Sequence, residues 1–211
     1  MQRDLKYFTA YSSVSHCGFV LFGVAALNMI AFKGAVIQMF SHGIMTALFF
    51  ALIGMVYGRT HTRMIDEMGG LAKKIPWLAT VFYIAGLASL GLPGLSGFVA
   101  ETHVFIGGFF GNSWSNNIVM KVLTVIAAMS LVVTAVYVLR GLGKVFYGPI
   151  RNSHFEKLTD ATVSERIATG LLAAVLIILG LFPWFFISMI ESSLMPIFNR
   201  LHETGAVALW H

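Results

Sequence analysis

The chain has 211 residues, of which 57% are hydrophobic and only 11% are charged, and soluble domains carry about 25% charged residues. So few charges cannot cover a soluble surface, and the formal net charge of +5 fits basic membrane-flanking loops better than a nucleic-acid-binding surface. The composition predicts an all-α integral membrane protein that contacts lipid, with no nucleic acid partner. Because Cys17 is the only cysteine, an intrachain disulfide is excluded, and we expect this thiol to be buried.

Five apolar segments are candidate membrane spans, because about 20 apolar residues cross a bilayer as a helix. In chain order they are 9–31, 35–57, 77–110, 118–142 and 167–190. The third covers 34 residues, too many for one straight crossing of about 30 Å at about 1.5 Å per residue. We therefore expect five transmembrane helices, of which the third is strongly tilted or discontinuous.

The basic residues between these spans predict an orientation. Alternating spans place 11 Lys and Arg residues on one side and three on the other. The first group is Arg3, Lys6, Arg59, Arg63, Lys73, Lys74, Arg140, Lys144, Arg151, Lys157 and Arg166, and the second is Lys33, Lys121 and Arg200. The positive-inside rule therefore predicts a cytoplasmic N-terminus and an outer C-terminus.

Two long connections, 58–76 and 143–166, lie on the expected cytoplasmic side. In the second, Thr162 or Ser164 could cap the last helix. The residues after 191, which include Trp210, are expected at the outer interface.

The third span contains GLPGLSG, which predicts an interruption at Gly91–Gly97. Pro93 lacks an amide hydrogen and clashes with the preceding helical turn, while Gly91, Gly94 and Gly97 relax the backbone around it. We expect a helix over 77–91, an irregular segment, and a helix over 97–110. Such half-helices are typical of ion sites in transporters, although a proline kink without function is the simpler alternative.

Glu101 favours a function for this interruption. It follows Gly97 by four residues and therefore shares its helix face, one turn beyond the break. A carboxylate within hydrocarbon is costly and usually faces a partner or water. This position favours a group that takes and releases protons over a purely structural carboxylate.

Two histidines are candidates for the same relay. Gln38, His42 and Thr46 are spaced four residues apart and make one polar stripe on an apolar helix, and His16 shares a face with Ser12. Imidazole titrates near neutral pH and can donate or accept a hydrogen bond, which suits proton transfer. The alternative is that each is a core histidine hydrogen-bonded to a neighbour.

Other chemistries find no support in the sequence. There is no Cys/His cluster for zinc or an iron–sulfur centre and no glycine loop for phosphate, and nothing supports haem ligation by His16 and His42. His103 is two residues from Glu101 and should point elsewhere on its helix. We expect neither a metal nor a cofactor in this chain.

Three blocks together carry a resemblance: DLKYFTAYSSVSHCGFVLFG, the run from GAVIQMFSHG to HTRMIDEMGGLAKKIPWLA, and ASLGLPGLSGFVAE. They resemble the antiporter-like M subunit (chain 4) of NADH–quinone oxidoreductase, respiratory complex I. The likeness is close over about 4–148 and weaker over 149–211. It divides the chain into part of an antiporter-like domain (1–148) and a region with a cytoplasmic loop, the final transmembrane helix and an outer tail (149–211).

The resemblance implies an inverted-repeat fold in the inner (plasma) membrane that carries protons while quinone is reduced elsewhere in the complex. It implies a path through the residues at His16 and His42 that ends at Glu101. NADH, FMN, iron–sulfur clusters and quinone would be bound by other subunits, and neighbouring antiporter-like subunits would be partners. As part of that complex the chain would belong to an enzyme without being catalytic alone.

The sequence also departs from this family. Ala100 replaces the glycine usual before the acidic residue, and His103 occupies an ordinarily apolar position. The five spans would match only the family's last five helices, which implies either a split subunit completed by a separate chain or a truncated reading frame. We therefore expect no pumping by this chain alone.

Two alternatives remain open. One is a subunit of a multi-subunit Na⁺/H⁺ antiporter or of a membrane-bound hydrogenase, against which the SH-x-GF and HTR blocks argue. The other is a fragment that packs in the membrane without transport activity.

Overall fold

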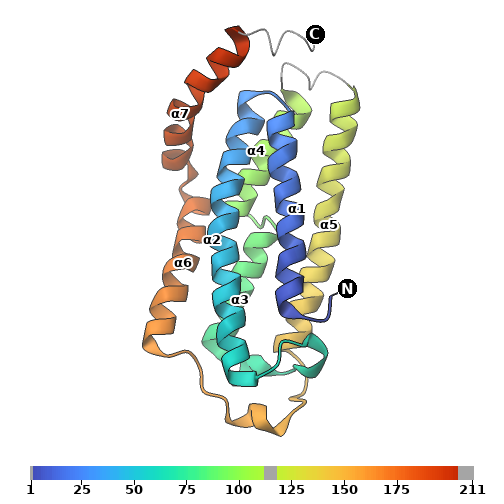
Figure 1. Cartoon of the computed structure of the whole chain (residues 1–211), viewed down its shortest axis with the longest axis vertical. Helices are drawn as coiled ribbons and strands as arrows, with labels where there is room; N and C mark the ends of the chain where they lie inside the picture. Colours follow the sequence, from blue (N-terminus) through green and yellow to red (C-terminus); the bar gives the residue numbers. More distant parts are fainter. Residues whose placement is uncertain (1, 112–117, 204–211) are drawn as a thin grey trace.

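The computed structural model describes residues 2–111 and 118–203 and is helical throughout these residues, apart from an isolated bridge between Asp4 and Met64 (Figure 1). The helices form an elongated bundle. They are α1 (Leu5–Ala25), α2 (Met29–Thr60), α3 (Pro76–Ser89), α4 (Ser96–Phe110), α5 (Ile118–Phe146), α6 (Val163–Leu181) and α7 (Pro183–Glu203).

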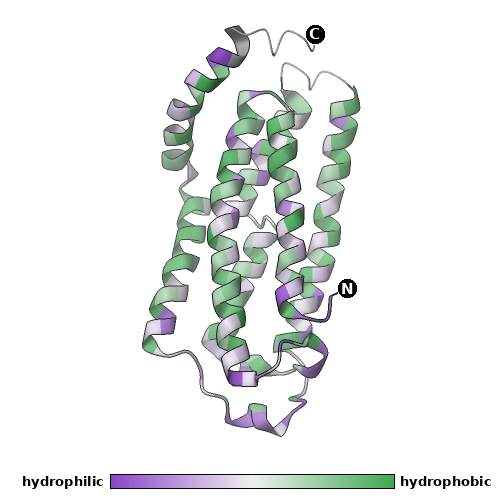
Figure 2. Ribbon diagram, viewed as in Figure 1, coloured by the Kyte–Doolittle hydropathy of each residue, from purple (hydrophilic) through white to green (hydrophobic). Residues whose placement is uncertain are grey.

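Four of these helices, α1, α2, α5 and α6, are long and apolar enough to cross a membrane, and α3 is a shorter apolar helix. Figure 2 shows hydrophobic residues over most of the bundle, with hydrophilic residues gathered at the loops of its lower end. The prediction of an integral all-α protein is confirmed. The boundaries differ from the predicted ones, because α2 continues to Thr60 and α5 to Phe146.

The centre of the bundle is α2, which packs against α1, α3, α4, α6 and α7. Its closest neighbour is α4, and glycines allow the two backbones to meet. A Cβ atom on Gly34 would overlap the backbone of Ala100 and Val104, and one on Gly107 would overlap Ala31. Small residues are used in this way where membrane helices approach closely.

The lower end of the bundle holds the larger apolar core. Phe82 stacks between Phe49 and Phe146, with ring centroids 5.4 Å and 5.2 Å apart. The loops close over it through charged contacts, including Arg59 with Glu165 at 2.6 Å. Thr162 begins α6 with a capping box to Glu165, which confirms the predicted cap.

The predicted continuous span 167–190 is wrong, because the helix ends at Leu181 and α7 begins at Pro183. Proline lacks the amide hydrogen needed to continue α6 but is well suited to the first turn of a new helix. This second interruption touches the segment between α3 and α4. A Cβ on Gly180 would overlap Gly94 and Leu95.

Two further expectations have different outcomes. Cys17 is exposed on the surface of the chain rather than buried. Trp210, expected at the outer interface, lies outside the described residues.

Candidate functional site

The site is centred on residues 90–95, which join α3 to α4. Figure 1 shows α4 continuing above α3, with the joining segment midway along the bundle. Gly91 and Gly94 have φ angles of 62° and 92°, a left-handed conformation in which glycine carries no Cβ penalty. Pro93 lies between them and prevents helical hydrogen bonding through the segment.

Glu101 is buried beside this segment, with 3% of its surface exposed. Its carboxyl group packs against Gly91, where a Cβ atom would overlap the carboxyl oxygens. Oε1 is fully buried and has no hydrogen-bond partner among the described residues. Because an unpaired carboxyl group is costly to bury, this side chain is a strong candidate for a functional role.

The two histidines meet between α1 and α2. The centroids of the His16 and His42 rings are 5.0 Å apart. Gln38 Nε2 is 2.7 Å from His16 Nδ1, and Thr46 Oγ1 is 3.2 Å from His42 Nε2. The side chains predicted as a stripe on α2 therefore join His16 in one polar cluster.

This cluster keeps hydrogen-bonding capacity in reserve. When the Gln38 amide donates to Nδ1, neutral His16 carries its own hydrogen on Nε2. That Nε2 atom is buried without a partner among the described residues, and so is the hydroxyl of Ser12 one turn earlier on α1. Unsatisfied buried groups of this kind call for an explanation, and a transport role supplies one.

Helix register brings the His16 side of the cluster towards Glu101. Helices α1 and α4 run in the same direction in Figure 1, and Phe19 packs on Phe105 with ring centroids 5.5 Å apart. His16 lies about one turn before Phe19, and the Glu101 side chain leans towards the start of α4. No direct hydrogen bond joins Glu101 to either imidazole within the described part of the chain.

One contact that the sequence did not reveal fixes this geometry. Ser41 and Ser96 are both buried, and their hydroxyl oxygens are 2.6 Å apart. The bond attaches the first residue of α4 to α2, directly beside His42. The only local signals for it were two serines in apolar surroundings.

Two other titratable groups lie away from Glu101. His103 Nδ1 is 2.7 Å from the carbonyl of Val99, and its Cβ lies against Gly34 of α2, so it points elsewhere as expected. Lys33 forms an ion pair of 2.8 Å with Glu191 of α7, which the sequence did not reveal. No metal-binding group of acidic, His and Cys side chains occurs within residues 2–111 and 118–203.

A membrane helix bundle with a buried acid beside an interrupted helix belongs to the class of antiporter-like membrane proteins. Residues 1–130 match the family described as NADH:quinone oxidoreductase/Mrp antiporter, transmembrane. The chain belongs to this family.

Similarity to individual proteins agrees with this assignment. The chain is 40% identical over 205 residues to the NAD(P)H-quinone oxidoreductase chain 4 1 of Thermosynechococcus vestitus, covering 96% of this chain and 38% of that relative. It is 29% identical to a chain of respiratory complex I from Thermus thermophilus, with a TM-score of 0.80, covering 95% of this chain and 40% of that one.

A chain of the Mrp complex from Dietzia sp. shares the fold, with a TM-score of 0.80 at 18% identity, covering 98% of this chain and 45% of that one. The chain therefore spans about two fifths of the length of the curated and solved proteins it matches.

Proposed function

We propose that this chain forms part of the proton-translocating membrane subunit of a complex I-type NAD(P)H–quinone oxidoreductase. The observation that carries the proposal is Glu101, which is buried against the left-handed Gly91 with one carboxyl oxygen unpaired. A titratable group at a helix break can bind a proton and release it when its surroundings change. The relatives' names supply the enzyme class.

The path proceeds through the polar cluster to Glu101. His42 and His16 lie within contact distance of each other, so a proton on one imidazole can pass to the other. Gln38, Thr46 and Ser12 orient the rings and offer hydrogen bonds to transient water. His16 Nε2 then faces the next step, to Glu101, which is the terminal site before the outer side.

The membrane topology follows from the same proposal. Helices α3 and α4 form one discontinuous crossing, and with α1, α2, α5 and α6 this makes five. The basic loops place the N-terminus in the cytoplasm and the C-terminus outside the inner membrane. Residues 1–148 belong to the transport domain, and 149–211 supply a loop, the last crossing and an outer tail.

The redox chemistry takes place elsewhere. NADH, FMN, iron–sulfur clusters and quinone are bound by other subunits, and the partners of this chain are neighbouring antiporter-like subunits and the portion of the relatives that it does not span. The chain acts as one component of an enzyme. It does not pump protons by itself.

The substitution Glu101→Gln in the assembled complex tests the proposal. Reconstituted in vesicles with a pH-sensitive dye, the variant should pump protons about tenfold more slowly per quinone reduced, because a general acid contributes at least that much to proton transfer. Its content of this chain should be unchanged. The matched control is His103→Gln, which lies on the same helix but points towards α2, and its proton pumping should be retained. Normal pumping by Glu101→Gln would remove the acid from the path.

The second candidate is a subunit of a Na⁺/H⁺ antiporter or of another ion-translocating membrane complex. The structural likeness to the Mrp chain favours it as an alternative. The genes next to this one discriminate between the two, because quinone-oxidoreductase subunits accompany the first and antiporter or hydrogenase subunits the second.

A further inference from the structure

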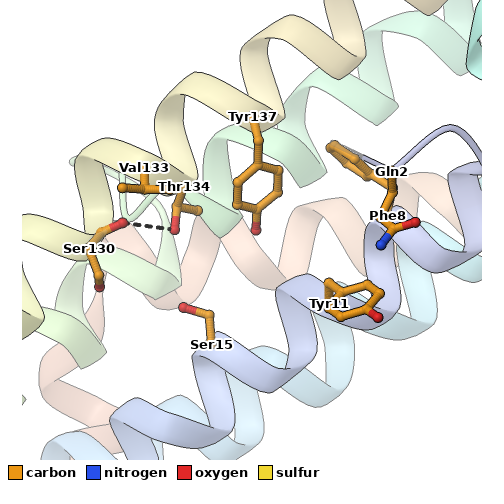
Figure 3. A pocket seen from close by; sticks show the side chains of 8 residues that line it. All are labelled: Gln2, Phe8, Tyr11, Ser15, Ser130, Val133, Thr134 and Tyr137. Carbon is orange, nitrogen blue, oxygen red and sulfur yellow. Dashed lines mark hydrogen bonds between the residues drawn. The ribbon is translucent and has the colours of Figure 1, made fainter.

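A groove with a volume of about 480 Å³ lies between α1 and α5, on the opposite side of α1 from the histidine cluster. Figure 3 shows the side chains that line it. Phe8 of α1 closes its lower end by packing on Tyr137 and Gly141 of α5. Above Phe8 the walls carry hydroxyl groups from both helices, namely those of Ser15, Ser130, Thr134 and Tyr137.

These hydroxyl groups are unusual for a surface that faces lipid. Ser130 and Thr134 donate to carbonyl groups of their own helix, at 2.6 Å and 3.2 Å. The Tyr137 hydroxyl is fully buried at the groove and has no partner among the described residues. Hydrocarbon offers no acceptor for it, and an unsatisfied polar group in lipid costs several kcal/mol.

The remaining outer surface of α5 has a different character. Its most exposed side chains are purely apolar, including Val125, Met129, Val132 and Leu139. Residues 130, 134 and 137 are therefore a local polar face on a helix that otherwise suits lipid. Small hydroxyl residues at such a face let another helix approach closely and accept or donate hydrogen bonds between helices.

We propose that this groove is the docking site for a transmembrane helix from the portion of the relatives that this chain does not span. The proposal rests on the proposed function, since it assumes assembly into the longer transport unit. The length of that portion, about three fifths of the relatives, supplies the occupant. The docked helix places small side chains over Ser130 and Thr134 and an acceptor opposite the Tyr137 hydroxyl.

A photo-crosslinking experiment in the assembled complex tests the docking. Benzoylphenylalanine is introduced at Val133, which lines the groove, and separately at Val132, whose side chain is rotated by about 100° around α5. After illumination, mass spectrometry should find the Val133 probe attached to an apolar, helix-length peptide from that portion. The Val132 probe supplies the background reaction with lipid. A lipid adduct at Val133, or attachment to a different subunit, would overturn the proposal.

Substitutions provide the second measurement. Ser130→Leu and Thr134→Leu should lower the yield of assembled complex severalfold, and Val132→Leu should not. Tyr137→Phe should lower the complex's resistance to dissociation in detergent. Glu101→Gln separates this proposal from the transport proposal, because it removes pumping without reducing assembly. Normal assembly of both leucine variants would contradict the docking site.

Discussion

Gly91 lies directly against the carboxyl group of Glu101, so that a single added methyl group would overlap the acid. The contact joins the helix break to the titratable side chain. Gly91 also has a φ of 62°, which other residues adopt only at a cost. Glycine is therefore required here for backbone conformation and for space.

The first prediction concerns Gly91→Ala. The left-handed conformation should cost about 1–2 kcal/mol of stability, and the methyl group should displace the Glu101 carboxyl group from the break. Proton pumping per quinone reduced should fall as strongly as in Glu101→Gln, measured in the same vesicles.

The matched control for Gly91 is Gly148→Ala. Gly148 has a φ of 90°, but no atom lies within 4 Å of its hypothetical Cβ, so this variant suffers the backbone cost alone. It should lose stability and keep its pumping ratio. Equal loss of pumping in both variants would show that backbone strain, rather than displacement of the acid, accounts for the effect.

The second prediction concerns Gln38, whose amide is 2.7 Å from His16 Nδ1. Gln38→Leu leaves that nitrogen without its donor, and a buried unsatisfied group costs about 1–3 kcal/mol. The ring should lose its fixed orientation, and the pumping ratio should fall while quinone reduction by the complex continues. The measurement is the ratio of protons moved to quinone reduced.

Ser41→Ala is the comparison for Gln38→Leu. It removes the bond to Ser96 but leaves both imidazoles with their present partners. It should weaken the attachment of α4 to α2 and lower thermal stability with a smaller change in the pumping ratio. A pumping ratio equal to that of the unsubstituted protein in Gln38→Leu would argue against a role for His16.

The sequence predicted the features that depend on local chemistry. The glycines and Pro93 indicated where a helix could not continue, and the four-residue spacing of Gln38, His42 and Thr46 placed them on one face. The rings of His16 and His42, 22 residues apart for the nearest bonded pair, meet only through the packing of α1 on α2.

Features that depend on packing between distant segments could not be predicted. Pro183 was hidden within the apolar run GLFPWFF, so the break between α6 and α7 resembled continuous membrane helix. Its contact with the other break, through Gly180 and Gly94, depends on the position of α6 beside α4. The bond between Ser41 and Ser96 is likewise visible only in three dimensions.

The third prediction concerns pH and the loop that closes the lower end of the bundle. Lys144 donates a hydrogen bond to Asp66 at 3.1 Å and, with Arg3 and Arg151 nearby, lowers the pKa of this carboxyl group. A lowered pKa means that the stabilisation is complete above the ordinary value and disappears as the pH falls through the folded-state value. Residues 62–68 should therefore exchange amide hydrogens faster, after correction for intrinsic rates, between about pH 5 and about pH 3.

Asp66→Asn provides the control for this titration. The amide cannot ionise, so the loop should already exchange faster at the higher pH and should lose the Asp66-dependent increase on acidification. High salt should reduce the difference between the two proteins, because the pairs are exposed to solvent. An identical pH dependence in both would assign the effect to another carboxyl group.

The fourth prediction concerns the ion pair between Lys33 of α2 and Glu191 of α7. The distance is 2.8 Å, with 14% of the Lys33 side chain and 44% of the Glu191 side chain exposed. It lies next to an apolar cluster that includes Ile37, Val99 and Ile190, and together they hold α7 against the bundle. Lys33→Met, Glu191→Gln and the double variant form a double-mutant cycle, measured by unfolding of the complex in detergent.

The cycle should give a coupling free energy of about 0.5–1 kcal/mol, the upper part of the range for exposed pairs, because Lys33 is largely covered. The control cycle pairs Glu191→Gln with Lys121→Met. Lys121 lies over the Phe109 ring instead, so the two changes should be additive. Additivity in the Lys33 cycle as well would mean that apolar packing alone holds α7, and that the ion pair contributes nothing measurable to its position.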